Sequence, residues 1–489
     1  MANRFAKLIF IPAPGVGHIV STVEVAKVLV NRDKRLTITI LVIKPPSVDT
    51  GLTINACIEA LAKNTVDDRI SFIQLPQDEA SSIFDPEDLM SFFNVFIKSH
   101  CKYVRNVVSH MTSQSDSGRI VGFVIDMFCT CMIDVANEFN VPTYLFFTSN
   151  AAVLGFNMYI QTLSDEMNKD YVIELSHSDT VLSVPTFVKP LPTKLFWNLV
   201  QIREGLDFVL ESIRKYRGVK AIMVNTFLEL ETFAIETMFA DTSIPPVYPV
   251  GPILNLEGGS HVEKPLDDDL IKWLDSQPHS SVVFLCFGSL GFFDESQVKE
   301  IARGLEQSGH RFVWSLRQPP SNQTSILPSD YEDPSVVLPD GFMERTRGIG
   351  KVIGWAPQVA VLSHDAVGGF VSHCGWNSLL ESLWFGVPSA TWPMYAEQQM
   401  NAFEMVVELG LAVEIRLDYK KDVFNPKANT VVNVTAEEIE RGIRGVMEDN
   451  EVRTKVKEMS AKSRFAVVEG GSSYESVGRL IEDFVKDLS

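Results

Sequence analysis

The chain has 489 residues, too many for one hydrophobic core, so its length predicts two domains of roughly 200–250 residues. Its hydrophobic content of 45% and charged content of 21% are those of an ordinary globular protein. The formal net charge of −19 opposes binding to a nucleic-acid backbone, and any anionic small ligand would need a locally positive pocket.

Cysteine content and hydropathy restrict the class of protein further. Six cysteines are sparse for this length, and Cys129 and Cys131 lie too close together for usual zinc spacing. We therefore expect six free thiols in a reducing compartment and no metal site. The N-terminal sequence MANRFAKLIFIP has too short an apolar run for a signal peptide, and no window offers ~18 apolar residues without charge. We expect a cytoplasmic protein that does not insert into a membrane.

The first half of the chain alternates strand and helix patterns. Apolar and β-branched runs predict strands at 7–14, 36–43, 70–76, 120–128 and 142–149. Amphipathic patterns predict helices at 22–30, 87–111 and 131–140. This alternation is typical of a parallel sheet that is covered by helices on both faces.

The alternation begins again after a proline- and glycine-rich stretch at 244–265, which we interpret as an interdomain linker. Further strands are predicted at 281–289, 310–317, 350–357, 368–375 and 388–394. A helix is predicted over 295–309 and is expected to end at Gly309. The capping box from Thr435 to Glu438 predicts the start of another helix. The polar, proline-rich residues 317–340 predict a long surface loop. The predicted fold class is therefore α/β, with two similar halves.

Ligands bind at the carboxyl ends of strands in open α/β sheets, and three stretches fall at such ends. In PGVGHIV two glycines allow a tight turn, but the third glycine of a dinucleotide fingerprint is replaced by Val20, and His18 occupies the loop. Asp126 ends a buried strand, which is costly unless its carboxylate is paired. Ser289 lies in a third such turn, FGSLG. A capping or surface role is the alternative for each of these residues.

The sequence HCGWNS, residues 373–378, gives a more specific pattern. It lies where a predicted strand gives way to a helix, and a helix N-terminus offers unpaired N–H donors and a positive dipole end. The side chains of His373, Asn377 and Ser378 add further donors. This pattern predicts a diphosphate cradle without lysine or metal, and its local positive field would overcome the negative net charge. An ordinary capped helix start is the alternative.

The segment from Trp355 to Gln398 resembles the signature box of the plant family 1 UDP-glycosyltransferases of secondary metabolism. It carries WAPQ, HCGWNS, E-x-x-x-x-G-V-P and a closing acid–Gln pair in the family's order. GVGH, FVIDMF, NTFLELE, YPVGP, VVFLCFGS and GGSSYESV also match, so the resemblance covers nearly the whole chain. The chain is most similar to the group E members, which glucosylate phenolic and terpenoid alcohols.

The resemblance implies a GT-B fold, in which two Rossmann-like domains with parallel sheets face each other across a cleft. Residues 1–250 would bind the acceptor, and residues 251–464 would bind the UDP-sugar. A last helix within 465–489 would pack back on the first domain. UDP-glucose would be a co-substrate, with no cofactor, metal or nucleic-acid partner, and the protein would act as a monomer.

The resemblance also assigns donor-binding residues by position. The uracil and ribose would be held by Trp355, Ala356, Gln358 and Glu381. The diphosphate would be held by Ser289, His373, Asn377 and Ser378. The sugar would contact Thr148, Trp376, Glu397 and Gln398. In this family a closing glutamine accompanies UDP-glucose, so Gln398 favours glucose as the transferred sugar, although Glu397 stands where many members have aspartate.

The family's catalytic pair falls on His18 and Asp126. His18 would be the general base, because an imidazole with an ordinary pKa of ~6.5 is largely neutral at cytosolic pH and can take a hydroxyl proton. Asp126 would orient the ring and stabilise the imidazolium. The third glycine is absent because the acceptor, not a pyrophosphate, would lie on this loop. The reaction would be a single displacement that inverts the anomeric carbon and gives a β-glucoside.

The acceptor pocket is the least defined part of the prediction. Its candidate lining residues are Gly17, Phe93, Phe96, Phe128, Phe147 and Phe196. A place in the plain hydrophobic core is the alternative for each phenylalanine. Flavonoid, simple phenol, triterpenoid and hormone-like acid acceptors all stay open.

Two other functions are compatible with parts of the sequence. A nicotinamide-dependent oxidoreductase would need a third glycine at Val20 and an acid at the end of the second strand, where Lys44 follows instead. A sugar-nucleotide binder without activity would keep the donor box and lose the base, but His18 and Asp126 are both present. Use of another UDP-sugar is a further alternative.

Overall fold

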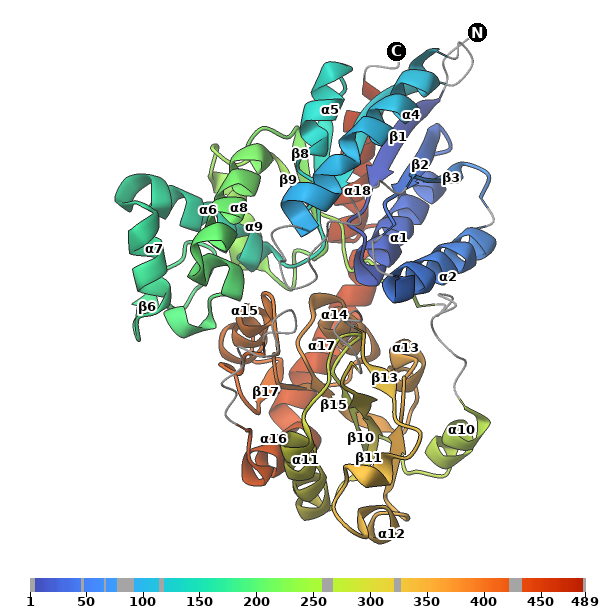
Figure 1. The fold of residues 1–489 in the computed structure, drawn as a ribbon, viewed down its shortest axis with the longest axis vertical. Helices are drawn as coiled ribbons and strands as arrows, with labels where there is room; N and C mark the ends of the chain where they lie inside the picture. Colours follow the sequence, from blue (N-terminus) through green and yellow to red (C-terminus); the bar gives the residue numbers. More distant parts are fainter. Residues whose placement is uncertain are drawn as a thin grey trace.

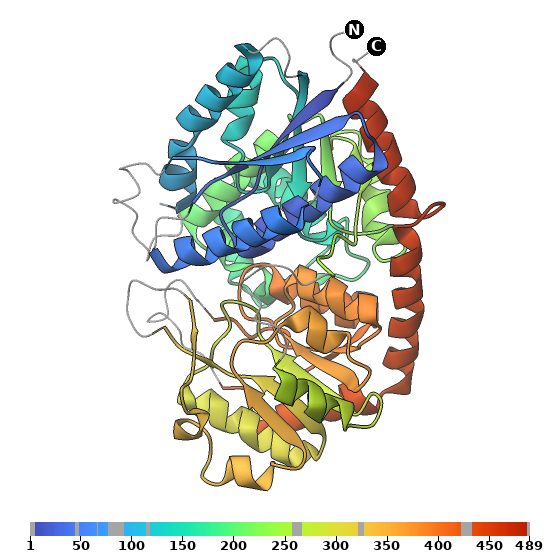
Figure 2. The same ribbon diagram turned by 90° about the vertical axis from the view of Figure 1, so that its right-hand side faces the viewer.

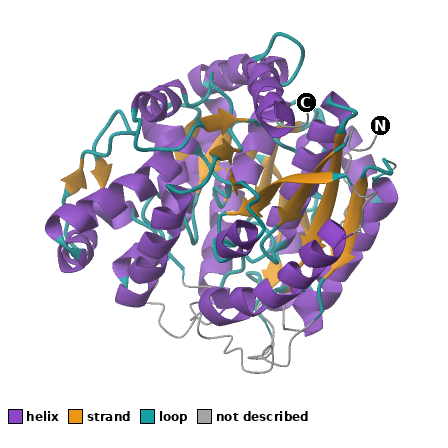
Figure 3. Ribbon diagram, turned by 90° about the horizontal axis from the view of Figure 1, so that it is seen from above, coloured by secondary structure: helices purple, strands orange, loops and turns teal. Residues whose placement is uncertain are grey.

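The computed structural model describes residues 5–44, 48–65, 67–76, 92–113, 118–256, 267–320, 327–421 and 433–486. It has two lobes, each built around its own sheet, one from each half of the chain (Figure 1). Seen from above, helices lie on both sides of the strands (Figure 3). The α/β class predicted from the sequence is confirmed.

The first sheet is wholly parallel. Its strands are β1 (Ala6–Ile11), β2 (Leu36–Val42), β3 (Ile70–Gln74), β4 (Arg119–Asp126), β5 (Thr143–Phe147), β8 (Ala221–Val224) and β9 (Val247–Pro249). Their order is β3-β2-β1-β4-β5-β8-β9, and each neighbouring pair runs in the same direction. Since β4 lies on the far side of β1 from β2, the order reverses between β1 and β4. This reversal is where an open sheet of this kind opens a crevice for ligands.

Both faces of the first sheet are buried, which explains the nearly continuous apolar runs of its strands. Ile9 and Phe123 belong to the core on one face, and Leu8 and Phe10 to the core on the other. The helices of this lobe are α1 (Val16–Arg32), α2 (Val48–Asn64), α4 (Cys101–Ser113), α5 (Met132–Glu138), α6 (Ala151–Met167), α7 (Lys169–Ser176), α8 (Arg203–Tyr216) and α9 (Thr232–Ala240). Shorter elements are η2 (Phe92–Ile97), η3 (Thr193–Leu195), η4 (Asn198–Gln201) and the paired strands β6 (Val181–Leu182) and β7 (Leu191–Pro192).

Two sequence predictions for this lobe need correction. The single helix expected over 87–111 is broken in its described part, because His100 Nδ1 lies 2.9 Å from the Phe96 carbonyl oxygen that a continuing helix would use. The backbone N–H of His100 instead donates to Ile97, and α4 begins only at Cys101. The linker expected over 244–265 begins later, since β9 within it pairs with β8 at the edge of the sheet.

The second lobe has the same architecture, a parallel sheet with helices packed on it. Its parallel sheet consists of β10 (Val282–Cys286), β11 (Arg311–Ser315), β14 (Gly350–Ile353), β15 (Val367–Ser372), β16 (Ser389–Thr391) and β17 (Ala412–Glu414), in the order β14-β11-β10-β15-β16-β17. The reversal here lies between β10 and β15. Its helices are α10 (Asp268–Asp275), α11 (Glu295–Ser308), α12 (Phe342–Arg345), α13 (Gln358–Leu362), α14 (Trp376–Phe385), α15 (Gln398–Phe403), η6 (Glu404–Glu408), α16 (Ala436–Glu448) and α17 (Asn450–Ala466).

Local signals in the second half are largely confirmed. Helix α11 ends on Gly309, whose φ of 68° suits a residue without a side chain. Thr435 Oγ1 accepts the N–H of Glu438, and the Glu438 carboxylate accepts the N–H of Thr435, so the capping box forms. The described part of the loop 317–340 contains the short antiparallel strands β12 (Arg317–Gln318) and β13 (Ser329–Asp330) and the turn η5 (Pro334–Val336). Residues 321–326 lie outside the described residues.

The last helix, α18 (Ser472–Val485), returns from the second lobe to the first (Figure 2). Leu480 and Phe484 lie in the same core as Leu8 and Phe10, and the Phe484 ring meets Tyr144 at a centroid distance of 4.6 Å. Tyr144 also donates its hydroxyl to Asp483 at 2.9 Å. We propose that the domain boundary lies near residue 250, with α18 belonging to the first domain.

The two lobes share a buried contact that is both apolar and acidic. Phe227 and Leu230 of the first lobe belong to the same core as residues of α14 and α17. Beside them, Glu231 accepts the N–H groups of Ala151 and Ala152 at 3.0 and 2.7 Å. Its carboxyl group also meets that of Glu404 from the second lobe. Burial and the neighbouring Glu231 carboxylate raise the pKa of Glu404 well above its ordinary value of 4.5. Burial and the neighbouring carboxylate therefore favour the protonated form of Glu404 at this interface.

This acidic pair predicts a pH-dependent stability. The unfolded chain releases the Glu404 proton near the ordinary pKa, whereas the folded protein retains it to a higher pH. The free energy of unfolding should therefore fall by about 1.4 kcal/mol per pH unit between these two pKa values. Glu404→Gln keeps a donor toward Glu231 and cannot titrate, so denaturant titrations at several pH values should show this decline removed. Glu236→Gln, at an exposed position on α9, should retain it. An equal decline of the unfolding free energy with pH in all three proteins would contradict the raised pKa of Glu404.

Candidate active site

Polar side chains follow the strands on both sides of the reversal in the first sheet. His18 lies in the first turn of α1, just after β1, and Asp126 is the last residue of β4. Because β1 and β4 are neighbours in parallel register, with Ile11 opposite Ile125, their carboxyl ends meet at one edge. Residues that are 108 positions apart in sequence are therefore brought into contact.

His18 and Asp126 form a short hydrogen bond. His18 Nδ1 lies 2.7 Å from Asp126 Oδ2, and the other carboxylate oxygen, Oδ1, accepts the N–H of Phe128 at 3.0 Å. The Asp126 side chain is fully buried, whereas the His18 side chain is 28% exposed. The carboxylate thus fixes the ring by Nδ1 and leaves Nε2 as the nitrogen that can accept a proton from a ligand.

The surroundings of His18 shift its basicity. Burial by itself would lower the pKa of His18, but the charge of Asp126, its hydrogen bond and the more distant charge of Glu397 outweigh burial and raise the pKa above 6.5. Thr148 Oγ1 lies 3.2 Å from the same Nδ1. The Phe128 and His18 rings pack in a T-shaped arrangement with their centroids 5.5 Å apart. The site therefore contains a base that is stronger than free histidine and is held from three sides.

The second sheet carries a matching site at its own reversal. Gly288 and Ser289 follow β10, and His373 follows β15. Gly288 has a φ of 73°, and a Cβ built on it would lie 2.6 Å from His373 Nε2. A Cβ on Gly375 would also lie 2.6 Å from that nitrogen, so only glycine fits on either side of the imidazole. Ser289 is exposed beside this turn.

The environment of His373 suits a neutral donor near an anion. Burial lowers the pKa of His373 to about 4, so the ring is uncharged near neutral pH. Its Nδ1 is buried and has no hydrogen-bond partner among the described residues. Helix α14 begins directly afterwards, and its N-cap, Gly375, supplies no side-chain bond to the first turn. The N–H groups of that turn and the imidazole are thus available donors at the positive end of a helix.

The residues predicted to hold the uracil and ribose lie together at the start of α13. Gln358 Nε2 donates to Ser378 Oγ at 2.9 Å and to Glu381 Oε2 at 2.7 Å, which ties α13 to α14 and orients the Glu381 carboxylate. Ala356 is 6% exposed and packs in the core beneath. Trp355 is partly exposed.

Two residues around Trp355 were not predicted from the sequence. The Arg317 guanidinium lies 5.1 Å from the centre of the Trp355 ring, and Asp330 Oδ1 accepts the backbone N–H of Trp355 at 2.8 Å. Asp330 also forms an ion pair with Arg317 at 3.2 Å. Both residues come from the segment predicted as a surface loop, where an Arg and an Asp 13 positions apart gave no recognisable signal.

The predicted sugar-binding pair lies at the domain interface. Glu397 Oε1 accepts the hydroxyl of Ser149 at 2.9 Å, which joins it to the residue after Thr148. Gln398 is 4% exposed, and its Oε1 accepts the N–H groups of Met394 and Tyr395 at 2.9 and 3.0 Å. The carbonyl oxygen of Gln398 is therefore committed to the backbone, so its NH₂ group is the end left for a ligand.

Trp376 lies differently from the simple expectation, and Asn377 contacts both lobes. The Trp376 indole is buried in the core between the lobes and donates to the Asn225 carbonyl at 2.7 Å. The side chain therefore packs at the interface, and only the backbone N–H of Trp376 is left to bind a sugar nucleotide. Asn377 reaches the first lobe, where its Nδ2 donates to Ser21 Oγ at 3.1 Å. A Cβ built on Gly17 would lie 3.9 Å from that Nδ2. Helix α14 thus contacts the loop that carries His18.

The aromatic residues predicted for an acceptor pocket separate into two groups. Phe128 lies beside His18, and Gly17 is exposed next to it. Phe96, Phe147 and Phe196 have exposed fractions of 2%, 0% and 0% and pack in the main core of the first lobe. A side chain that lines an open pocket is accessible to solvent, so these three belong to the core. The side chain of Phe93 lies outside the described residues.

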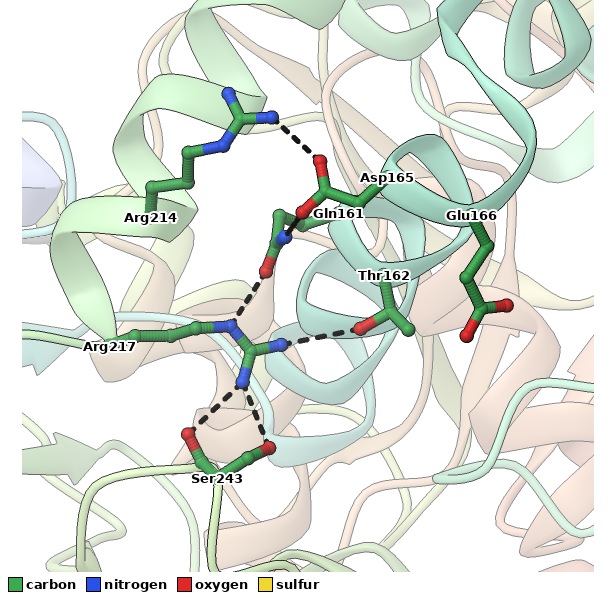
Figure 4. Close-up of a pocket in the computed structure, with 7 residues that line it drawn as sticks. All are labelled: Gln161, Thr162, Asp165, Glu166, Arg214, Arg217 and Ser243. Atoms are coloured by element: carbon green, nitrogen blue, oxygen red, sulfur yellow. Dashed lines mark hydrogen bonds and ion pairs between the residues drawn. The ribbon is translucent and has the colours of Figure 1, made fainter.

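A separate hollow lies between α6 and α8, away from these loops (Figure 4). Its charged groups bond to one another: Arg214 pairs with Asp165 at 2.8 Å, and Arg217 donates to Gln161 at 2.6 Å. Within the described residues no group of three or more His, Cys, Asp and Glu side chains is placed to hold a metal ion. No helix in the described part of the chain is long and apolar enough to cross a membrane.

Comparison with known proteins agrees with this geometry. The family model "UDP-glucoronosyl and UDP-glucosyl transferase" matches residues 16–433. The UDP-glucose flavonoid 3-O-glucosyltransferase 6 of Fragaria ananassa is 53% identical over 487 residues, which cover 98% of this chain and 99% of that protein.

Solved structures show the same similarity. A glycosyltransferase from Siraitia grosvenorii in complex with UDP is 43% identical, with a TM-score of 0.84 over 98% of this chain and 100% of that one. Medicago truncatula UGT71G1 complexed with UDP-glucose is 40% identical, with a TM-score of 0.82 over 99% of both chains. With its two facing Rossmann-like domains, the chain has the GT-B fold and belongs to the UDP-glycosyltransferase family of plant enzymes.

Proposed function

We propose that this enzyme transfers glucose from UDP-glucose to a hydroxyl group of a small plant secondary metabolite and forms a β-O-glucoside with inversion at the anomeric carbon. The observation that carries the proposal is the hydrogen-bonded pair His18–Asp126 at the carboxyl end of one sheet, next to Gly17, where a built Cβ would lie 3.9 Å from Asn377 Nδ2 at the start of α14. None of the six cysteines, all of which lie in the described part of the chain, forms a disulfide bond, which supports action in the reducing cytoplasm.

The donor site of this proposal lies on the second domain. Trp355 would stack on the uracil, and Glu381, oriented by Gln358, would bind the ribose hydroxyls. The diphosphate would lie against His373, Ser289 and the first turn of α14. A neutral histidine and helix N–H groups contribute partial charges only, yet in a buried site such fixed dipoles stabilise an anion strongly. The complexes of the Medicago and Siraitia proteins with UDP-glucose and UDP support this placement.

Glu397 and Gln398, at the domain interface, would bind the glucose. Glu397 offers acceptors for sugar hydroxyls, and the NH₂ group of Gln398 offers donors. Because the Gln398 carbonyl is held by two backbone N–H groups, its amide cannot turn over without losing both bonds. A fixed donor at this position selects the sugar whose hydroxyl oxygen points at it, which supports glucose as the transferred sugar.

The base would act from the first domain. His18 Nε2 takes the proton of the acceptor hydroxyl while the oxygen attacks the anomeric carbon from the face opposite UDP, so the configuration inverts. The buried Asp126 carboxylate stabilises the imidazolium that forms. The departing UDP gains negative charge, and the dipole of α14 with the first-turn N–H groups stabilises it. Holding both substrates in one geometry supplies much of the remaining rate.

The acceptor would be a small apolar or aromatic alcohol, because the Phe128 ring lies beside the base and offers an apolar contact. The name of the Fragaria relative identifies a flavonoid as the acceptor of that enzyme. A flavonoid or another phenol is therefore the first class to test here, with terpenoid alcohols second.

The proposal predicts one acceptor class that depends on His18. Incubation with UDP-glucose and a mixed pool of flavonoids, phenols, terpenoid alcohols and carboxylic acids should add one hexose to one class, as read by mass spectrometry. His18→Ala should lower the rate about 10²–10⁴-fold, the usual contribution of a general base. His279→Ala, an exposed histidine in the loop before β10, should keep the wild-type rate.

Each other outcome has a distinct meaning. Binding of UDP-glucose without product from any acceptor would indicate a sugar-nucleotide binder. Equal rates for wild type and His18→Ala would leave the transferase and remove His18 as its base. Faster transfer from another UDP-sugar would correct the donor assignment alone.

The raised pKa of His18 predicts the shape of the pH profile. Only the neutral imidazole is a base, so kcat should fall as pH drops below a pKa that Asp126 holds above 6.5. Asp126→Asn removes that charge, and the acidic limb should therefore move to lower pH while the plateau falls about 10²–10⁴-fold. Asp134→Asn, an exposed carboxylate on α5, should leave the profile unchanged. An unshifted limb in Asp126→Asn would assign the titration to another group.

A further inference from the structure

Asn225 is a fully buried residue whose polar groups are all occupied. It follows β8, and its N–H donates to the Phe147 carbonyl at 3.1 Å. Its side-chain Oδ1 accepts the N–H of Ile253 at 2.8 Å, in the segment that leaves the first domain. Its backbone carbonyl accepts the Trp376 indole N–H at 2.7 Å. One residue therefore joins the first sheet, the interdomain connection and the start of α14.

The side-chain Nδ2 of Asn225 has two contacts, one to the Ile253 carbonyl oxygen at 3.5 Å and one that reaches the donor site. In the second, Nδ2 donates to Asn377 Oδ1 at 3.2 Å. This bond fixes the orientation of the Asn377 amide, because Oδ1 is held and Nδ2 must point the other way. Asn377 Nδ2 then donates one hydrogen to Ser21 and lies beside Gly17, next to the loop of His18. An NH₂ group has two hydrogens, so the second one is available to a ligand.

We propose that Asn225 is a positioning residue of the donor site: it sets the orientation of the Asn377 amide so that its NH₂ group, not its carbonyl oxygen, faces the diphosphate. The inference rests on the proposed donor site at α14. An anion distinguishes sharply between the two ends of an amide, since one donates a hydrogen bond and the other repels. The role requires both a donor and an acceptor on one short side chain, which asparagine supplies and aspartate does not.

The sharpest test is Asn225→Asp, which has nearly the same shape. The new carboxylate still accepts the Ile253 N–H, and the backbone bond from Trp376 is untouched. In its ionised form it cannot donate to Asn377 Oδ1, so the Asn377 amide should turn over and give its NH₂ to the carboxylate; UDP binding is therefore measured at a pH high enough to ionise it. The Ser21 hydroxyl can donate to the turned carbonyl, so the interface stays bonded. The carbonyl oxygen, however, now faces the diphosphate.

The measurement is the dissociation constant for UDP by isothermal titration calorimetry, with the melting temperature of each protein. We expect Asn225→Asp to weaken UDP binding about 10–100-fold, as for a lost charge-assisted hydrogen bond. Asn225→Ser, which is too short to reach Asn377 and adds no charge, should weaken it in the same direction. Asn157→Asp, another asparagine buried in the first domain at 3% exposure, should leave UDP affinity as in wild type.

A double variant separates positioning from general stability. If Asn225 acts through Asn377, then Asn225→Asp should cost less than about twofold in UDP affinity once Asn377→Ala is present. Multiplying effects in the double variant, or wild-type affinity in Asn225→Asp and Asn225→Ser, would overturn the inference. A wild-type protein that fails to bind UDP would instead contradict the proposed function, so the two failures are distinguishable.

Discussion

The buried carboxylate of Asp126 is the interaction on which the active site depends. A charged group at the end of an apolar strand is tolerated only when it is paired, and here it is satisfied by the His18 ring and by the N–H of Phe128. The hydrogen bond to Asp126 fixes the imidazole by Nδ1 and leaves Nε2 accessible to a ligand. The geometry of the proposed catalytic pair and the pairing of the buried strand end therefore depend on the same bonds.

The second constraint is the way in which the two domains meet. Polar side chains from the strand ends of one sheet bond directly to those of the other: Ser149 with Glu397, Asn150 with Asn401, and Asn225 with Asn377. Each contact ties a residue of the first domain to a segment proposed to hold the donor. Because hydrogen bonds are directional and the pairs are buried or partly buried, they specify the relative position of the domains more sharply than apolar contact would.

The electrostatics of the molecule follow from local structure and not from its overall charge. The chain is strongly acidic, yet the proposed diphosphate site holds a neutral histidine, two glycine turns and an uncapped helix start. Burial makes these partial charges effective, because little solvent screens them. Burial and the neighbouring Glu231 carboxylate likewise raise the pKa of Glu404 and favour its protonated form.

The sequence by itself determined the elements and the chemistry at their ends. Period-2 and period-3.6 patterns, glycine turns and the capping box depend on neighbours along the chain, so the parallel sheets, α11 and α16 could be predicted. The rule that ligands meet strand ends singled out His18, Asp126 and HCGWNS, and the family resemblance gave them roles. The described part of the helix predicted over 87–111 is helical except at His100, whose side chain lies against a backbone carbonyl oxygen, a contact that periodicity does not register.

Only the tertiary structure decided which of these residues touch. The 2.7 Å bond of His18 to Asp126, the burial of Phe96, Phe147 and Phe196 in the core, and the commitment of the Trp376 indole to the interface depend on packing between distant segments. Asn225 carried no sign of its role beyond its place after a strand. Contacts between segments this far apart in the chain are set by sheet order and domain closure, and a linear pattern of residues does not encode them.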